Sequence, residues 1–131
     1  GMAGVRLGYA LSADTALLEQ MQACGQPWGV SSLAQAAGLA ALEETAYVEK
    51  VRALIAEQRP RLTAGLRALG LRVLDGRANY LLFQAPETLQ RGAVLRSCAN
   101  YPGLGPGWYR TAVRTGPENE QLLKLLAEVL E

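Results

Sequence analysis

The sequence contains no histidine, and this absence removes several kinds of chemistry at once. Histidine is the most common general base and the most common zinc ligand in enzymes. Serine–histidine and cysteine–histidine hydrolase chemistry is therefore excluded within these 131 residues, and a zinc site is not expected. Cysteine is also scarce: Cys24 and Cys98 lie far apart and outside any CxxC spacing. We expect two reduced thiols in a cytoplasmic protein.

An excess of charge and long apolar runs are missing as well. Thirteen basic and twelve acidic residues leave a net charge of +1, which gives no electrostatic reason to expect binding to nucleic acid or to an anionic membrane surface. No apolar run approaches the roughly 18 residues of a transmembrane helix, and no secretory signal peptide is recognisable. Half of the residues are hydrophobic, which is enough for the core of an ordinary domain.

The first third of the chain predicts one strand and two short helical segments. Residues 5–11 are apolar apart from Arg6 and are bounded by Gly4 and Ser12, a pattern typical of a buried strand. Because this strand is apolar on both faces, we expect it to lie inside a sheet, although no partner strand is evident nearby. A short helix should follow Ser12 and end at Gly25.

Two further helices are predicted in the middle of the chain. The first begins near Ser32, which stands at capping-box spacing from Gln35, and it is rich in alanine. The second extends from about residue 45 to residue 69, with apolar side chains at helical spacing. Pro60 lies in its interior and should kink it, and Gly70 should end it.

The last third predicts a small sheet and a covering helix. Alternating apolar residues, separated by turn signals rich in glycine and proline, indicate several short strands. These strands are expected over residues 71–74, 78–84, 93–96 and 108–114. Thr115 and Glu118 form a second capping box before an amphipathic helix. The predicted fold is an α/β two-layer sandwich, with helices packed on a mostly antiparallel sheet and one stray N-terminal strand.

Three arginines are candidates for binding anions. Arg110 and Arg114 should share one face of the last strand, about 13 Å apart at their Cα atoms. They could converge on a doubly anionic ligand, pair with separate carboxylates, or simply be solvated on an open sheet face. Arg6, in the middle of an apolar strand, is either at a strand end near solvent or held by an anion.

The sequence resembles enzymes of the class I and II aminotransferase fold, which use pyridoxal phosphate (PLP). Residues 4–9 (GVRLGY) are similar to the GxRxGY signature of that family, and residues 109–115 (YRTAVRT) are similar to the strand that grips the substrate. Further similar segments are residues 27–31 (PWGVS), residues 78–83 (ANYLLF) and Glu118-Asn119. The resemblance implies that Arg6 binds the PLP phosphate and that Arg110 binds the α-carboxylate of the substrate.

Within this class, one segment resembles the threonine-phosphate decarboxylases of cobalamin biosynthesis. Residues 95–101 (LRSCANY), followed by Gly103-Leu104-Gly105, carry that likeness, although Ser97 stands where those enzymes usually have aspartate. This resemblance implies a lyase acting on L-threonine O-3-phosphate, a phosphorylated amino acid, with Arg114 as a candidate for binding the substrate phosphate. Histidinol-phosphate or related aminotransferases (transferases rather than lyases) are the alternative.

The resemblance also implies a division of the chain and a missing reactive group. Residues 1–30 would be a remnant of the large PLP domain, residues 31–70 the interdomain helices and residues 71–131 the small C-terminal domain. The lysine that carries PLP in the family would precede residue 1, and Lys50 and Lys124 lie in a different sequence context. We therefore expect this chain alone to bind no PLP and to be inactive. Alternatively, it is a non-catalytic module that binds a partner or forms a homodimer through its N-terminal strand or helices.

Overall fold

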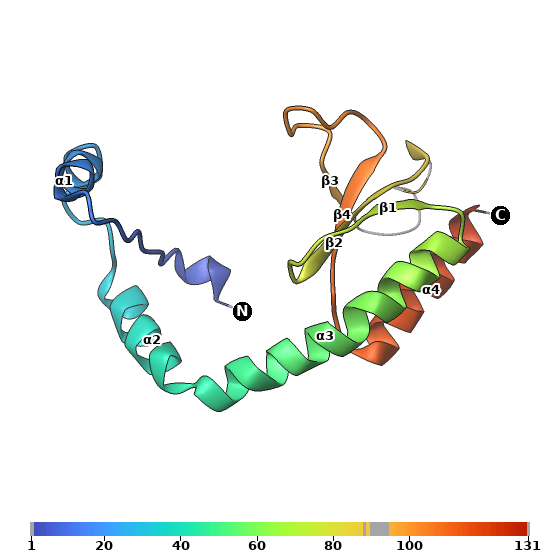
Figure 1. Cartoon of the computed structure of the whole chain (residues 1–131), viewed down its shortest axis with the longest axis horizontal. Coiled ribbons are helices and arrows are strands. Elements are labelled where there is room, and N and C mark those ends of the chain that lie inside the picture. Colours follow the sequence, from blue (N-terminus) through green and yellow to red (C-terminus); the bar gives the residue numbers. More distant parts are fainter. Residues whose placement is uncertain (1, 88, 90–94, 131) are drawn as a thin grey trace. The chain divides into compact units, whose positions relative to one another are not determined.

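A computed structural model describes residues 2–87, 89 and 95–130 of the chain (Figure 1). The chain divides into two compact units, Gly1–Val48 and Glu49–Glu131, and each is described by itself. In the described residues, no helix combines the length and the hydropathy that a membrane span requires. The division into a large-domain remnant, interdomain helices and a small domain concerns the full-length family and remains a prediction.

The N-terminal unit consists of short helices with polar caps. A 3₁₀ helix, η1 (Ala3–Val5), is followed by α1 (Thr15–Ala23) and α2 (Ser32–Glu43). The helix α1 begins where the Asp14 carboxylate accepts a hydrogen bond from the backbone N–H of Leu17 at 3.0 Å. Ser31, one residue before the predicted Ser32, caps α2. Gln35 does not close a capping box, because its side chain donates to the carbonyl of Val30 instead.

The predicted N-terminal strand is wrong. Val5 ends η1, Arg6 adopts a left-handed conformation with φ of 57°, and residues 7–12 belong to no helix or strand. A strand needs a neighbour to satisfy its backbone N–H and C=O groups. All strands that the structure describes lie between Arg72 and Ala112, and they form one sheet without this segment. The apolar composition was therefore not sufficient to make residues 5–11 a strand.

The long helix α3 (Thr45–Ala68) confirms the prediction for the middle of the chain and continues through Pro60. Gly70 follows it with φ of +78°, a conformation that glycine adopts without the steric penalty of a Cβ atom. The N–H of Gly70 bonds to the carbonyl of Arg67, and the N–H of Leu71 bonds to that of Leu66. These two bonds are a Schellman motif, so the chain turns sharply into the sheet.

The sheet of the C-terminal unit has four strands in the order β1-β2-β4-β3, and every neighbouring pair is antiparallel. The strands are β1 (Arg72–Leu74), β2 (Tyr80–Gln84), β3 (Arg96–Ser97) and β4 (Trp108–Ala112). The strand predicted over residues 93–96 lies partly outside the described residues. The final helix, α4 (Gly116–Leu130), follows β4 directly.

One face of the sheet packs against helices, which confirms the predicted two-layer α/β sandwich for this unit. Leu62 and Leu66 from α3 and Leu126 from α4 meet Phe83 and Tyr109 of the sheet in one buried cluster. The helices α3 and α4 lie side by side (Figure 1) and approach closely where Gly65 faces Leu123. The opposite face carries the other residues of each strand, because neighbouring side chains in a strand alternate between faces.

Candidate anion-binding site

A pocket of about 500 Å³ lies on the sheet face opposite the helices. Strands β2, β3 and β4 supply most of its walls, and the segments that adjoin them supply the rest. Its lining residues are Asn79, Tyr80, Leu95, Arg96, Arg110, Thr111, Ala112 and Arg114. Among the described residues, three guanidinium groups therefore border this pocket, and no carboxylate side chain is part of its lining.

Two of these arginines, Arg96 and Arg110, are direct neighbours on adjacent strands. The register of β3 and β4 pairs Arg96 with Arg110 across the antiparallel ladder. Like charges placed directly opposite each other destabilise a sheet. In the part of the chain that the structure describes, neither guanidinium forms an ion pair with an acidic side chain. An anion between the two groups would offset their repulsion and accept hydrogen bonds from both.

The third arginine, Arg114, is held at the junction between β4 and α4. Its guanidinium donates to the Glu118 carboxylate at 3.0 Å. The side chain of Asn119 fixes the Arg114 backbone, because its Oδ1 accepts from the Arg114 N–H at 3.1 Å and its Nδ2 donates to the Arg114 carbonyl at 2.8 Å. Asn119 is buried, so this pair of hydrogen bonds sets where Arg114 leaves the strand.

Glu118 is connected to this site through its ion pair with Arg114. It also accepts hydrogen bonds from the hydroxyl of Thr115 at 2.6 Å and from the Thr115 N–H at 3.2 Å. The second of these bonds is half of the predicted capping box. The Thr115 hydroxyl, followed by the Arg114 guanidinium, lowers the pKa of the Glu118 carboxyl. Glu118 therefore stays charged at neutral pH. Its ion pair with Arg114 offsets the charge of that arginine.

Arg110 and Arg114, which were predicted to share one face of the last strand, both line this pocket, although β4 ends at Ala112 and Arg114 lies just beyond it. Their binding roles remain predictions. Arg96 was not predicted as a site residue, although it falls in the motif of residues 95–101. Only the register of β3 against β4, across the intervening loop, brings Arg96 next to Arg110. The arrangement suits a ligand with more than one anionic group, because planar guanidinium forks bind carboxylate and phosphate through paired hydrogen bonds.

Arg6, which was predicted to bind the PLP phosphate, and the two lysines of the chain do not form a complete cofactor site. Arg6 is an exposed residue of the N-terminal unit, where its guanidinium donates to the Ala3 carbonyl at 3.4 Å. Its other N–H groups suit a phosphate, but Arg6 lines none of the three described pockets. Lys50 in α3 and Lys124 in α4 are exposed and line none of the three described pockets. The described residues therefore do not fit PLP, whose covalent attachment needs a lysine inside a pocket.

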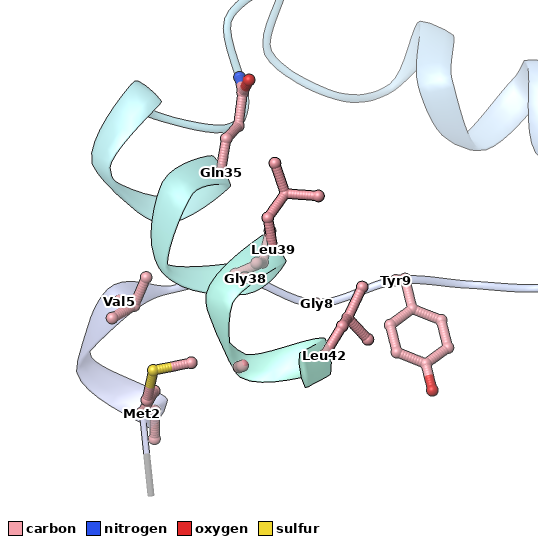
Figure 2. Close-up of a pocket in the computed structure, with 11 residues that line it drawn as sticks. Met2, Val5, Gly8, Tyr9, Gln35, Gly38, Leu39 and Leu42 are labelled. Carbon is pink, nitrogen blue, oxygen red and sulfur yellow. The ribbon is translucent and has the colours of Figure 1, made fainter. Parts of the chain in front are cut away.

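A second hollow, of about 630 Å³, lies within the N-terminal unit and is apolar. Its lining includes Met2, Val5 and Tyr9 from the N-terminal segment and Leu39 and Leu42 of α2, and Figure 2 shows Leu42 beside Tyr9. Of the residues that the structure describes, no charged side chain lines this hollow, and its polar side chains are Tyr9 and Gln35. Among the described residues, no group of three or more cysteine, aspartate or glutamate side chains could hold a metal ion.

Comparison with known proteins gives a consistent set of relatives. The family model described as "Aminotransferase class I and II" matches residues 1–129. Threonine-phosphate decarboxylase of Salmonella typhimurium is 38% identical over 136 residues, which cover 97% of this chain and 37% of that protein. Histidinol-phosphate aminotransferase of an Anaeromyxobacter species is 38% identical over 139 residues, covering 99% of this chain and 37% of that protein. The chain thus spans little more than a third of the length of these relatives.

Solved structures share the fold. The histidinol-phosphate aminotransferase from Clostridium acetobutylicum superimposes with a TM-score of 0.85 at 26% identity, over 98% of this chain and 42% of that one. The L-threonine-O-3-phosphate decarboxylase from Porphyromonas gingivalis superimposes with a TM-score of 0.73 over 90% of this chain and 40% of that one. At 20% identity, this second match speaks for the fold alone.

Proposed function

Because this chain belongs to the class I and II aminotransferase family, we propose that its sheet carries the substrate-binding site of a PLP-dependent enzyme that acts on a phosphorylated amino acid. The observation that carries the proposal is the three-arginine pocket of Arg96, Arg110 and Arg114. The whole enzyme's activity is part of the proposal, since the chain spans about 37% of its curated relatives.

The three arginines divide between two anionic groups of the substrate. Arg110 lies on the central strand of the trio β2-β4-β3 and is half-buried, which suits a single carboxylate held by one guanidinium fork. Arg96 and Arg114 are more exposed and border the same pocket, so they suit a phosphate with its three terminal oxygens. Glu118 holds Arg114 in place until the phosphate arrives.

The proposed substrate is L-threonine O-3-phosphate, and the proposed reaction is its decarboxylation, a step in cobalamin biosynthesis. This molecule carries both a carboxylate and a phosphate, which uses all three arginines. Histidinol phosphate, the substrate named for the aminotransferase relatives, has a phosphate but no carboxylate. It would leave one cation of the pocket without an anionic partner, which makes a histidinol-phosphate aminotransferase the second candidate.

We expect the chain by itself to be inactive in PLP chemistry. Arg6 is proposed to bind the PLP phosphate only when the rest of the fold surrounds it. Incubation with PLP, borohydride reduction and intact-mass measurement test this point. An unmodified mass is the expected result, whereas a stoichiometric adduct on Lys50 or Lys124 would contradict it. Lys50→Arg and Lys124→Arg variants identify the modified position.

Self-association is a candidate function of a different class, favoured by the exposed apolar surface of the N-terminal unit. Ala34 is the only buried residue among those described there, whereas Trp28 is 93% exposed and Leu33 is 82% exposed. Such surfaces are typical of interfaces. Pairing through an N-terminal strand loses its basis, because that strand is not formed, so a homodimer would use the helices. Sedimentation at micromolar concentration should give a dimer, and a monomer throughout would exclude it.

We propose a cytoplasmic location, because two cysteines far apart in the sequence and outside any CxxC spacing are typical of reduced thiols.

Calorimetric titration of the chain with O-phospho-L-threonine tests the proposed site. Arg96→Gln and Arg110→Gln should each weaken binding by about tenfold or more, since a charge-assisted hydrogen bond contributes about 1.5–3 kcal/mol. Arg72→Gln is the matched control, because Arg72 lies on the same sheet but does not line the pocket. Equal affinities for all four proteins would contradict the proposed site.

A further inference from the structure

Tyr80 lies beside Arg110 on the pocket face of the sheet. The register of β2 and β4 pairs Tyr80 with Ala112, so Arg110 is the diagonal neighbour of Tyr80 on the same face. Diagonal neighbours are within reach when one side chain is aromatic and the other is long. The guanidinium carbon of Arg110 lies 4.9 Å from the centre of the Tyr80 ring, within the range of a cation–π contact.

This contact holds the guanidinium without neutralising it. A guanidinium that packs on an aromatic face keeps the N–H groups at the edge of its plane available for an anion. A carboxylate partner would instead occupy some of those N–H groups, as Glu118 does at one guanidinium nitrogen of Arg114. Among the described residues, Arg110 forms no ion pair with a carboxylate, and its guanidinium packs on the ring of Tyr80.

We propose that Tyr80 is a positioning residue, which orients the Arg110 guanidinium for the carboxylate of the substrate while leaving its N–H groups free. This inference rests on the proposed function of the three-arginine pocket. A flexible arginine loses side-chain freedom when a ligand orders it, and this loss weakens binding. The ring of Tyr80 imposes part of that order before the ligand arrives. The phenol hydroxyl has no part in this role.

The same sheet offers a matched control. Arg72 of β1 lies 5.6 Å from the centre of the Trp108 ring in a second cation–π contact, and neither residue lines the pocket. Replacing Trp108 with leucine removes a contact of the same kind from the same sheet. Any effect of losing an aromatic ring on sheet stability is then common to both variants, whereas an effect on Arg110 is specific to Tyr80.

The test compares the full chain with its Tyr80→Leu, Tyr80→Phe and Trp108→Leu variants by calorimetric titration with O-phospho-L-threonine. Tyr80→Leu should raise Kd about two- to fivefold, as expected for an exposed cation–π contact. Tyr80→Phe keeps the ring and should recover the lost affinity, and Trp108→Leu should bind like the unmodified chain. In the ligand-free protein, the NMR order parameter of the Arg110 Nε–H should fall in Tyr80→Leu but not in Trp108→Leu.

Two results overturn the positioning role while the proposed function stands. One is an unchanged Kd in Tyr80→Leu, and the other is a loss in Tyr80→Phe as large as that in Tyr80→Leu, which would assign the effect to the hydroxyl. Failure of the proposed function looks different, because the unmodified chain would then not bind O-phospho-L-threonine at all. That result overturns the inference as well, and the titration of the unmodified chain alone identifies it.

Discussion

Replacing Asn119 with alanine should loosen the junction that places Arg114 in the pocket. The Asn119 side chain forms two hydrogen bonds to the Arg114 backbone, at 3.1 and 2.8 Å, and it is only 5% exposed. Alanine can form neither bond. The backbone N–H and C=O groups of Arg114 would then lose their partners at a site that water reaches poorly.

The expected cost follows from these two bonds. Each contributes about 1 kcal/mol to the free energy of unfolding, and the higher helix propensity of alanine returns about 0.5 kcal/mol. The net loss is about 1.5 kcal/mol, which lowers Tm by about 6–12 °C for a unit of this size. Glu120→Ala is the matched control, because Glu120 is exposed on the same helix and forms no ion pair with any other described residue. The unfolding free energy of Glu120→Ala should stay within about 0.5 kcal/mol of that of the unmodified chain.

Tryptophan fluorescence can follow the C-terminal unit alone. The chain has two tryptophans, and Trp28 belongs to the N-terminal unit, where its side chain is 93% exposed. In a Trp28→Phe background, Trp108 of β4 is the single reporter. Urea unfolding then gives a free energy for the unit that contains the pocket. If Asn119→Ala unfolds at the same urea concentration as Glu120→Ala, the two hydrogen bonds do not hold the junction.

Three other perturbations give sharp expectations for the same unit. Tyr109→Phe should leave the unfolding free energy unchanged or raise it by up to about 1 kcal/mol, because the buried Tyr109 hydroxyl finds no hydrogen-bond partner in the described structure. A clearly lower unfolding free energy, measured by urea unfolding, would refute this. Gly107→Ala should lower the unfolding free energy by about 1–3 kcal/mol, since Gly107 has φ of +82° and a Cβ atom added there would lie 3.0 Å from a backbone oxygen. Gly76→Ala is the control and should be nearly neutral, because a Cβ atom there meets no other atom within 4 Å. Equal losses of unfolding free energy would contradict the reasoning. The pKa of Glu118 is lowered, first by the Thr115 hydroxyl, so the contribution of the Glu118 carboxylate to stability is complete above the ordinary glutamate pKa and is lost as pH falls through the lowered value. The Tm of the unmodified chain, measured against pH, should therefore converge in acid with the Tm of Glu118→Gln. Parallel curves would argue against this contribution.

The sheet and its covering helices could be predicted because their signals are local. Helical spacing predicted α3, and Gly70 predicted its end, since a glycine with positive φ permits the Schellman turn. The alternation of apolar residues predicted β2 and β4 within two residues of their observed ends. The family resemblance, which the family model confirms over residues 1–129, rested partly on the segments of β2 and β4 and partly on motifs outside them, such as residues 4–9 and 95–101.

The errors concern interactions between distant segments. Residues 5–11 have the composition of a strand, but a strand also needs a partner, and no local pattern reveals whether one exists. Arg96 could not be selected as a site residue, because its place beside Arg110 depends on the register of two strands separated by a glycine-rich loop. The contact of Tyr80 with Arg110 could likewise not be predicted, because it depends on the register of β2 against β4; in the sequence, Tyr80 is only one residue of a motif.

The central claim is that Arg96, Arg110 and Arg114 bind two anionic groups of one ligand. The most direct test is calorimetric titration of the chain with O-phospho-L-threonine, L-threonine and inorganic phosphate at one salt concentration. The two-anion ligand should bind at least about tenfold more tightly than either one-anion ligand, because each additional charge-assisted contact contributes more than about 1.4 kcal/mol. Equal affinity for O-phospho-L-threonine and inorganic phosphate would contradict the account, since the carboxylate would then have no partner in the pocket.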